Sequence, residues 1–146
     1  MNVKFFILLF VLILNGSNIK AGQIKIKVTN IEEKVGQIHF ALYDKPDYFP
    51  EEKGKILGLV EDAAKVFKDW FVINDLQESF YAVAIYHDEN SNNEFDTFLS
   101  IPQEKYGFSN DAPVLFGPPK FKQAEFYVGQ SDMIEIEIRL RWRKEF

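Results

Sequence analysis

The most apolar run beyond the first 21 residues is Tyr81-Ala82-Val83-Ala84-Ile85-Tyr86-His87. Successive side chains of an extended chain point to opposite faces, so Tyr81, Val83 and Ile85 share one face and the residues between them share the other. Both faces are apolar, which is typical of a strand that is covered on both sides. The run therefore predicts the central strand of a β-sheet, with His87 at the end of the inner row.

Segments on both sides of this run alternate between apolar and polar residues, as half-buried strands do. The alternation covers residues 24–28, 38–42, 126–128 and 134–140. The first two segments flank a charged stretch that ends in Gly36, so we interpret them as a hairpin with a loop of several residues. Residues 60–71 have the spacing of a short helix, but the aromatic and β-branched run at residues 70–73 favours a strand that ends near Asn74.

Two polar segments interrupt the pattern, residues 44–58 and residues 88–119. A structureless loop as long as the second is uncommon, and is usually functional or held in place by something. Six or seven strands, no clear helix and no internal repeat predict an all-β fold. We expect an antiparallel β-sandwich of about seven strands, similar to transthyretin-like or carboxypeptidase-regulatory-like modules, with one long loop after the central strand.

The start of the chain has the order of an export signal. Lys4 precedes an unbroken apolar run at residues 5–14, a break follows at Asn15-Gly16-Ser17, and Ala21, with Ile19 two residues before it, offers a cleavage point. About ten apolar residues are too few to cross a bilayer core of roughly 30 Å, which favours a signal peptide over a membrane anchor. We expect residues 1–21 to be removed near Ala21, leaving residues 22–146 as a single periplasmic or secreted domain with no transmembrane span. An uncleaved anchor or a buried first strand is the alternative.

The composition narrows the possible functions. Lys and Arg total 17 against 22 Asp and Glu, for a net charge of -5, which argues against a nucleic-acid partner that requires many phosphate contacts. The chain has no cysteine, so disulfides, thiolate metal sites and cysteine nucleophiles are excluded. Only His39 and His87 could supply imidazole ligands.

The segment after the central strand carries oxygen-bearing side chains at every second position: Asp88, Asn90, Asn92, Glu94 and Asp96. This spacing is similar to the first half of an EF-hand loop, in which the seventh residue, here Glu94, offers its backbone carbonyl. Asn93 stands where Gly is expected, and Leu99 stands where the bidentate Glu is expected. The segment predicts a Ca²⁺ site; the alternative is a turn closed by the side chains' own hydrogen bonds.

Several linked motifs, taken in order, resemble a known bacterial family. They are Tyr81-Ala82-Val83-Ala84, His87-Asp88-Glu89-Asn90 with Asn92 and Asp96, Ile101-Pro102 with Glu104, Tyr106-Gly107-Phe108-Ser109-Asn110, and Gly117-Pro118-Pro119 with Phe121 and Ala124. The chain resembles the family called "domain of unknown function 2141" from Gly22 to Leu140. The resemblance implies an exported all-β domain with no assigned activity and transfers no catalytic residue. The family pattern usually has glycines where this chain has Ser91 and Asn93.

We therefore expect a non-catalytic module of the cell envelope that binds an unidentified ligand or protein. In this hypothesis Ca²⁺ holds the neighbouring segment, residues 101–110, in a conformation that can bind a ligand. The candidate ligand-binding residues are His87, Glu89, Glu104, Tyr106, Phe108 and Asn110. The aromatic segments at residues 106–110 and 116–119 offer a platform for a sugar or peptide, or else fold back to cap the sandwich. A small envelope hydrolase that uses His87 with Glu89 or Ser109 is the alternative function.

Overall fold

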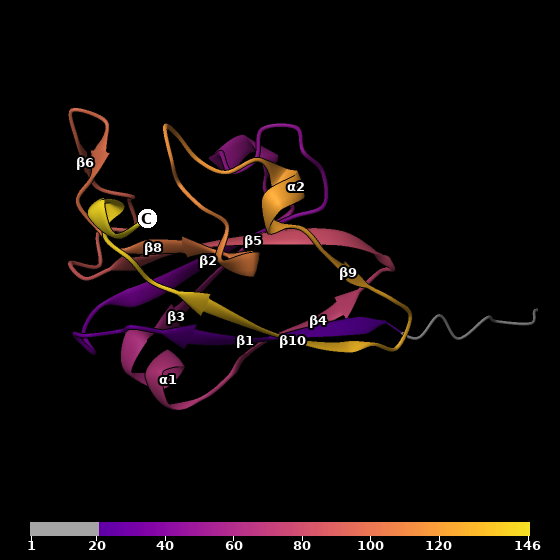
Figure 1. Ribbon diagram of the computed structural model, residues 1–146. Helices are drawn as coiled ribbons and strands as arrows, with labels where there is room; N and C mark the ends of the chain where they lie inside the picture. Colours follow the sequence, from indigo (N-terminus) through magenta and orange to yellow (C-terminus); the bar gives the residue numbers. More distant parts are fainter. Residues whose placement is uncertain (1–20) are drawn as a thin grey trace, which may run out of the picture.

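The computed structural model describes residues 21–146 (Figure 1). The expected signal peptide lies outside the described residues, apart from Ala21. The strands, in chain order, are β1 (Gly22–Thr29), β2 (Gln37–Tyr43), β3 (Leu57–Asp62), β4 (Phe71–Leu76), β5 (Ser79–Asp88), β6 (Thr97–Phe98), β7 (Ile101–Pro102), β8 (Tyr106–Phe108), β9 (Phe126–Val128) and β10 (Met133–Arg139). The helices are α1 (Ala63–Lys68) and α2 (Phe121–Ala124), with short 3-10 helices η1 (Glu52–Gly54), η2 (Ser109–Asp111) and η3 (Arg143–Glu145).

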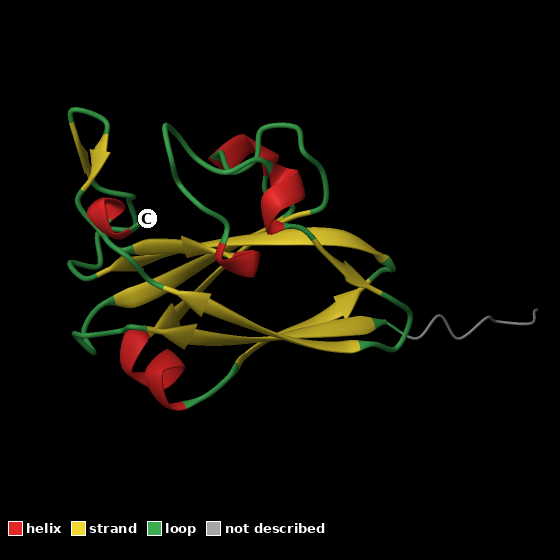
Figure 2. Cartoon of the chain, in the orientation of Figure 1, coloured by secondary structure: helices red, strands yellow, loops and turns green. Residues whose placement is uncertain are grey.

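The strands form two main sheets. One has three strands in the order β10-β1-β4, with β1 parallel to β10 and antiparallel to β4. The other has five antiparallel strands, in the order β3-β2-β5-β8 with β9 also paired to β5. Figure 2 shows the two sheets facing each other. The fold is therefore rich in strands with few helices, and the expected all-β class is confirmed.

The inner faces of both sheets contribute to one hydrophobic core. Ile24 and Ile26 of β1 are fully buried and belong to the same cluster as Ile38 of β2 and Val83 of β5. Burying each such side chain contributes about 1.5–3 kcal/mol. Because one cluster includes residues from the two sheets, neither sheet has a complete core of its own.

The central strand β5 is covered on both faces, as predicted. Its inner row of Tyr81, Val83 and Ile85 lies in the shared core. On its outer face, Ala82 belongs to a second buried cluster with aromatic residues from β2, β8 and α2. This second cluster holds the segments that follow the loop against the outer face of the sheet.

The expected hairpin between residues 24–28 and 38–42 is wrong. Strand β1 pairs with β10 and β4, whereas β2 pairs with β3 and β5 in the other sheet. The connection crosses between the sheets, and Ile31, within it, is 6% exposed and part of the shared core. A connection that buries a side chain between two layers does not allow its flanking strands to pair with each other.

Helical structure was underestimated from the sequence. The segment at residues 60–71 contains the end of β3, then α1, and then the start of β4, so the competing helix and strand interpretations each describe a part of it. The side chain of Asp62 caps the start of α1 by accepting a hydrogen bond from Lys65 N at 2.9 Å. Ala63 and Val66 are the buried residues of this helix. The strand expected to end near Asn74 ends at Leu76.

The two polar segments also contain regular structure. Helix η1 and the start of β3 lie in residues 44–58, and β6, β7 and β8 lie in residues 88–119. Residues 21–146 form ten strands instead of about seven, because several strands have only two or three residues and leave no periodic signal. None of the helices in this part of the chain is long and apolar enough to cross a membrane.

Candidate functional site

The loop that leaves β5 is built around Asp88. This carboxylate is fully buried and accepts hydrogen bonds from Asn92 N at 3.2 Å and Asn93 N at 2.8 Å. Asn90 Oδ1 also accepts from Asn92 N, at 3.0 Å, and Asn92 Oδ1 accepts from Glu94 N at 2.8 Å. Each side-chain oxygen thus binds a backbone N–H further along the chain, which curls the loop around the end of the strand.

Two residues of the loop have left-handed backbone conformations. Ser91 has φ 58° and Asn93 has φ 62°. These are the two positions at which the family pattern usually has glycine, the residue that adopts positive φ at the lowest cost. The loop therefore keeps a glycine-type backbone shape although its residues carry side chains.

The predicted metal-ligating side chains lie close together, with one exception. The Asp96 carboxylate accepts hydrogen bonds from Asn90 Nδ2 at 2.8 Å and from Asn92 Nδ2 at 3.0 Å. Asp88 accepts a hydrogen bond from the backbone N–H of Asn92, whose side chain binds Asp96. The Glu94 side chain is exposed, and the contact of this residue within the loop is the hydrogen bond that its backbone N–H donates to Asn92 Oδ1. Within residues 21–146, no three His, Cys, Asp or Glu side chains are grouped closely enough to hold a metal ion, so asparagine oxygens would have to complete a ligand set.

Glu104 is a buried carboxyl group beside this loop. It is 6% exposed, and its Oε2 accepts a hydrogen bond from Asp96 N at 3.2 Å. Its Oε1 has no hydrogen-bond partner among the described residues. Burial raises the pKa of Glu104 to about 7, and the charges of Asp88, Asp96 and Glu89 act in the same direction. Negative charge is therefore concentrated here without a compensating cation from the described residues.

His39 connects the loop with the outer face of the five-stranded sheet. Its Nε2 lies 3.3 Å from Asp88 Oδ2, without the geometry of a hydrogen bond. Burial lowers the pKa of His39, although the Asp88 carboxylate opposes this change. The imidazole stacks on Tyr86, with the ring centroids 4.4 Å apart and the planes 15° apart. The neutral imidazole is thus held between the buried carboxylate and an aromatic ring.

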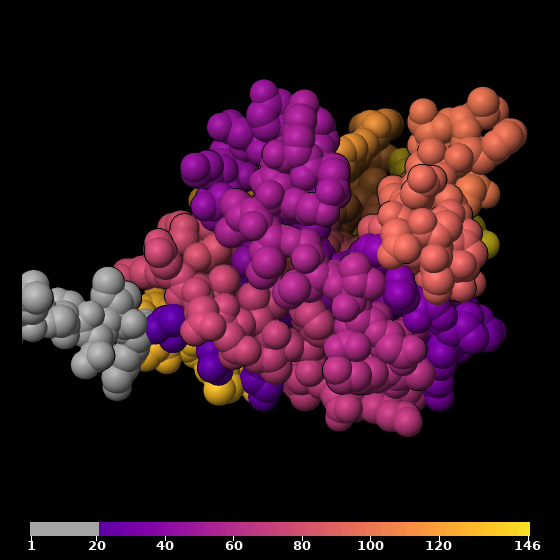
Figure 3. Space-filling model, turned by 180° about the vertical axis from the view of Figure 1, so that it is seen from behind, coloured from indigo at the N-terminus to yellow at the C-terminus, as the bar shows by residue number. Residues whose placement is uncertain are grey.

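A cavity of about 720 Å³ lies on the outer face of this sheet. Its floor is made by Ala41, Gly58 and Ala84, which are paired across β3, β2 and β5. Asn93 and Phe95 of the loop line it on one side. Figure 3 shows a recess between the lobe that contains the β2–β3 connection and the lobe that contains β6.

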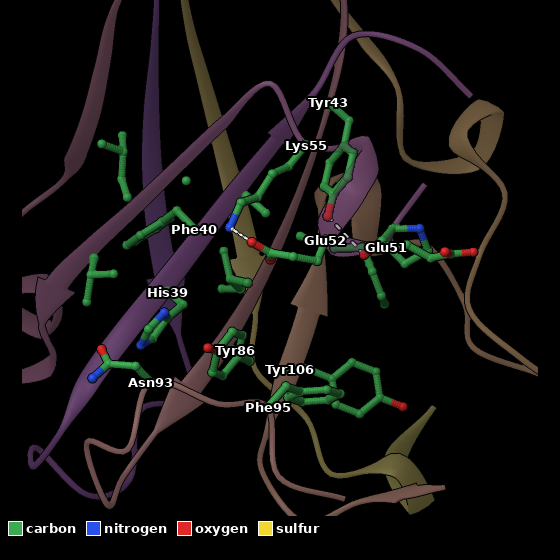
Figure 4. Close-up of a pocket in the computed structure, with 18 residues that line it drawn as sticks. His39, Phe40, Tyr43, Glu51, Glu52, Lys55, Tyr86, Asn93, Phe95 and Tyr106 are labelled. Atoms are coloured by element: carbon green, nitrogen blue, oxygen red, sulfur yellow. Dashed lines mark hydrogen bonds and ion pairs between the residues drawn. The ribbon is translucent and has the colours of Figure 1, made fainter. Parts of the chain in front are cut away.

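The rest of the lining is aromatic and charged. Figure 4 shows His39 and Tyr86 on one side, Glu52 and Lys55 on another, and Phe95 with Tyr106 at one end. Tyr43 donates a hydrogen bond to Pro50 O at 2.9 Å, and burial raises its pKa to about 12. Burial likewise raises the pKa of Tyr86 to about 12. Both phenols therefore remain protonated at neutral pH.

Two of the six candidate ligand-binding residues line this cavity, namely Tyr106 and Phe108. His87 is 1% exposed, and its Nε2 lies 2.8 Å from Val35 O. Glu104 is buried beside the loop, and Asn110 Nδ2 donates to Glu125 O at 2.6 Å. Glu89 Oε1 lies 3.6 Å from His87 Nδ1. The structure therefore distributes these six residues over the cavity, the loop and the ends of the sheet.

The suggested catalytic serine is not placed beside His87. Ser109 is fully buried, and its Oγ accepts from Val83 N at 2.9 Å and donates to Ala124 O at 2.6 Å. Val83 and His87 are four residues apart on β5, which corresponds to about 13 Å along a strand. Ser109 therefore joins β5 to the end of α2.

Most residues of the cavity could not be identified from the sequence pattern alone. The charged group of Glu51, Glu52 and Lys55 lies in a segment without periodicity, and Phe95 is hidden between polar residues. The one usable signal is the set of small residues at Ala41, Gly58 and Ala84. These three positions are recognised as a common floor only when the pairing of β2 with β3 and β5 is known.

The sequence profile of one family, described as "Uncharacterized protein conserved in bacteria (DUF2141)", matches residues 26–135. The chain belongs to this family. The resemblance inferred from the linked motifs is thereby confirmed. The matched DUF2141 region includes the Asp88–Asp96 loop and all residues that line the cavity. Neither the curated proteins nor the solved structures gave a match to this DUF2141 chain.

Proposed function

We propose that the protein is an exported, non-catalytic binding module of the bacterial cell envelope whose Asp88–Asp96 loop is organised by Ca²⁺. In this proposal the two sheets form a β-sandwich similar to transthyretin-like or carboxypeptidase-regulatory-like modules, and the cavity on the outer face is the binding site. One observation carries the proposal. Asn93 and Phe95, which line the cavity, belong to the same loop in which Asp88, Asn92 and Asp96 come together.

Calcium is the ion that best fits the chemistry of the loop. Ca²⁺ binds carboxylate, amide and backbone carbonyl oxygens, which are the groups offered by Asp88, Asn90, Asn92, Glu94 and Asp96. Zn²⁺ prefers nitrogen or sulfur ligands, and Mg²⁺ requires a stricter octahedral geometry. The left-handed residues at the fourth and sixth positions support an EF-hand-type curl, since the sixth position is glycine in that loop.

Buried charge gives a second reason for a cation at this place. Asp88 is fully buried, and Glu104 has one oxygen without a partner among the described residues. Burying a carboxylate is costly unless a positive charge or several hydrogen bonds compensate for it. A divalent cation in the loop would stabilise Asp88, Asp96 and Glu104 together. In a turn closed only by hydrogen bonds, Glu104 Oε1 has no partner among the described residues, and burial raises the pKa of Glu104 to about 7.

The binding module is favoured over the hydrolase by the environment of the candidate catalytic groups. His87 is 1% exposed, and its Nε2 lies 2.8 Å from Val35 O, within hydrogen-bonding distance. Ser109 Oγ is engaged by backbone groups of Val83 and Ala124. A nucleophile and its base must both reach substrate and each other. The open cavity offers such access, and neither His87 nor Ser109 lines it.

Thermal unfolding of the exported protein, with Ca²⁺ or with EDTA, tests the proposal. A ligand present at 100 times its Kd adds about 2.7 kcal/mol to the free energy of unfolding, so saturating Ca²⁺ should raise the Tm by several degrees. Asp96→Asn should lose most of this increase. Asp69→Asn, which alters an exposed carboxylate at the end of α1, should keep it. Coincident curves for the wild-type protein in Ca²⁺ and EDTA would refute the metal site.

A further inference from the structure

We infer that the cavity on the outer face of the five-stranded sheet binds an uncharged carbohydrate, with Phe95 as the stacking surface for a sugar ring. The inference rests on the proposed function, because Phe95 belongs to the loop that the ion would organise. It adds to that proposal the chemical class of the ligand. Four features of the cavity lead to it: its floor, its aromatic rings, its charge and its hydrogen-bonding groups.

The cavity exists because three adjacent strands carry small residues on the same face. Ala41 is paired with Gly58 on one side and with Ala84 on the other. Larger residues surround this floor, among them His39 and Tyr86, which pair with each other along the same two strands. The resulting volume of about 720 Å³ lies in the range of small-molecule sites. The hollow is therefore a property of the sheet itself.

Phe95 is the aromatic ring of the cavity best placed to contact a ligand. It is 41% exposed, whereas Tyr106 is 7% exposed and Phe108 is 6% exposed. The ring is held on two sides, with its centroid 5.2 Å from that of Tyr86 and 5.7 Å from that of Tyr106. Figure 4 shows Phe95 beside Tyr106 at one end of the cavity. A partly exposed aromatic ring that is held by its neighbours suits contact with the flat C–H surface of a sugar ring.

The charged residues at the mouth of the cavity are compensated within the protein. Glu52 pairs with Lys55, and Glu51 Oε2 lies 3.1 Å from Lys53 Nζ. A charged ligand would have to disrupt one of these pairs or leave its own charge without a partner. The cavity therefore favours an uncharged ligand.

The cavity also offers hydrogen-bonding groups, which distinguish a sugar from a purely apolar ligand. Tyr43 is satisfied by Pro50 O, but among the described residues neither the Tyr86 hydroxyl nor the Asn93 side-chain amide has such a bond. Figure 4 shows both groups close to His39. A hydroxyl is both donor and acceptor, and an amide supplies one acceptor and two donors. This set matches the hydroxyl groups at the edge of a sugar ring.

Titration of the Ca²⁺-loaded exported protein with neutral disaccharides, followed by amide NMR, tests the inference. The probes are cellobiose, maltose and N,N′-diacetylchitobiose, and their charged counterparts are digalacturonate and the chitosan disaccharide. At least one neutral probe should shift the amide signals of Ala41, Gly58 and Ala84, and should bind at least about tenfold more tightly than its charged counterparts. Tighter binding of the charged probes, or no shift with any neutral probe, would overturn the inference.

Variants of one aromatic ring provide the matched controls. Phe95→Ala should weaken binding of the neutral probe at least about tenfold, and Phe95→Tyr should restore it. Phe98→Ala alters a more exposed phenylalanine nearby that does not line the cavity, and should bind as the wild type does. Equal weakening by Phe95→Ala and Phe98→Ala would overturn the role of Phe95.

Failure of this inference is distinguishable from failure of the proposed function. If Ca²⁺ raises the Tm of wild-type protein and of Phe95→Ala alike but no neutral sugar binds, only the ligand class is wrong. If a neutral sugar binds in a Phe95-dependent way with the same affinity in EDTA, the sugar site stands and the role of Ca²⁺ is wrong.

Discussion

Glu104 is the residue whose environment most needs a partner. Within residues 21–146, one oxygen of its buried carboxyl group is hydrogen-bonded and the other has no partner, and the nearby charges of Asp88 and Asp96 are repulsive. Folded proteins rarely keep such a group without a role. We therefore treat Glu104 as the side chain that reports whether a cation is present.

Replacing Glu104 by Gln should have opposite consequences with and without Ca²⁺. In EDTA, at a pH above 7, the variant should be more stable by about 1–3 kcal/mol, because an uncompensated buried charge is removed. In saturating Ca²⁺ this gain should shrink or reverse, because the carboxylate then lies beside a cation. Urea unfolding under both conditions measures the difference. An equal gain in stability in EDTA and in Ca²⁺ would show that Glu104 does not interact with a bound ion.

The Asp111–Arg141 pair gives a pH-dependent prediction. The Arg141 guanidinium binds the Asp111 carboxylate and holds its pKa below 3.8. Because the folded-state pKa is lowered, the stabilisation is present above pH 3.8 and is lost as the pH falls through the folded-state value. The Asp111 side chain is 56% exposed, so we expect a contribution below about 1 kcal/mol. Asp111→Asn should show this loss at pH 7, and the wild-type and variant curves should converge as the pH falls below the folded-state pKa of Asp111.

At the scale of the elements, the connection between β1 and β2 positions the start of the loop. Gly36 has φ 72°, and a Cβ atom placed on it would lie 2.1 Å from Asp88 O. The backbone of the connection thus packs directly against the end of β5. Only glycine allows this approach, so the position of Asp88 depends on a residue far from it in the sequence.

Gly36→Ala should therefore destabilise the protein by more than about 2 kcal/mol, through the left-handed backbone and the contact with Asp88. Gly117→Ala is the matched control, because a Cβ atom there has no neighbour within 4 Å. Urea unfolding of both variants gives the comparison. A loss at Gly36→Ala no larger than that at Gly117→Ala would show that the connection does not position the loop.

The sequence predicted the elements with strong alternation well, and the others poorly. Strands β5, β9 and β10 were expected close to their observed bounds, because alternating burial directly follows the two faces of a sheet. The pairing of β1 with β10 was missed, since strands far apart in sequence carry no local signal of their partner. Short strands such as β6 and β8 depend on contacts made elsewhere in the fold.

The candidate site was predictable only where its residues lie within one short segment of the sequence. The loop side chains Asp88, Asn90, Asn92 and Asp96 were selected from spacing, and they lie together. The cavity combines β2, β3, β5 and the loop, so it required the strand register. Local chemistry is readable from sequence, whereas concave surfaces formed by several strands are not.

At the scale of the whole molecule, one core joins both sheets, so we expect a single cooperative unfolding transition. Ile26→Ala in β1 and Ile38→Ala in β2 should each lower the free energy of unfolding by about 2–5 kcal/mol. Val72→Ala, at a position 40% exposed on β4, should cost less than about 1 kcal/mol. Urea unfolding that separates into two transitions would contradict a shared core.

The most direct test of the calcium loop is a crystal structure of the exported protein grown with Ca²⁺. We expect one ion, bound at about 2.3–2.6 Å by side-chain oxygens of Asp88, Asn90, Asn92 and Asp96 and by the Glu94 carbonyl. The contrary result is a loop with no ion, in which the Asn90 and Asn92 amides still donate hydrogen bonds to Asp96.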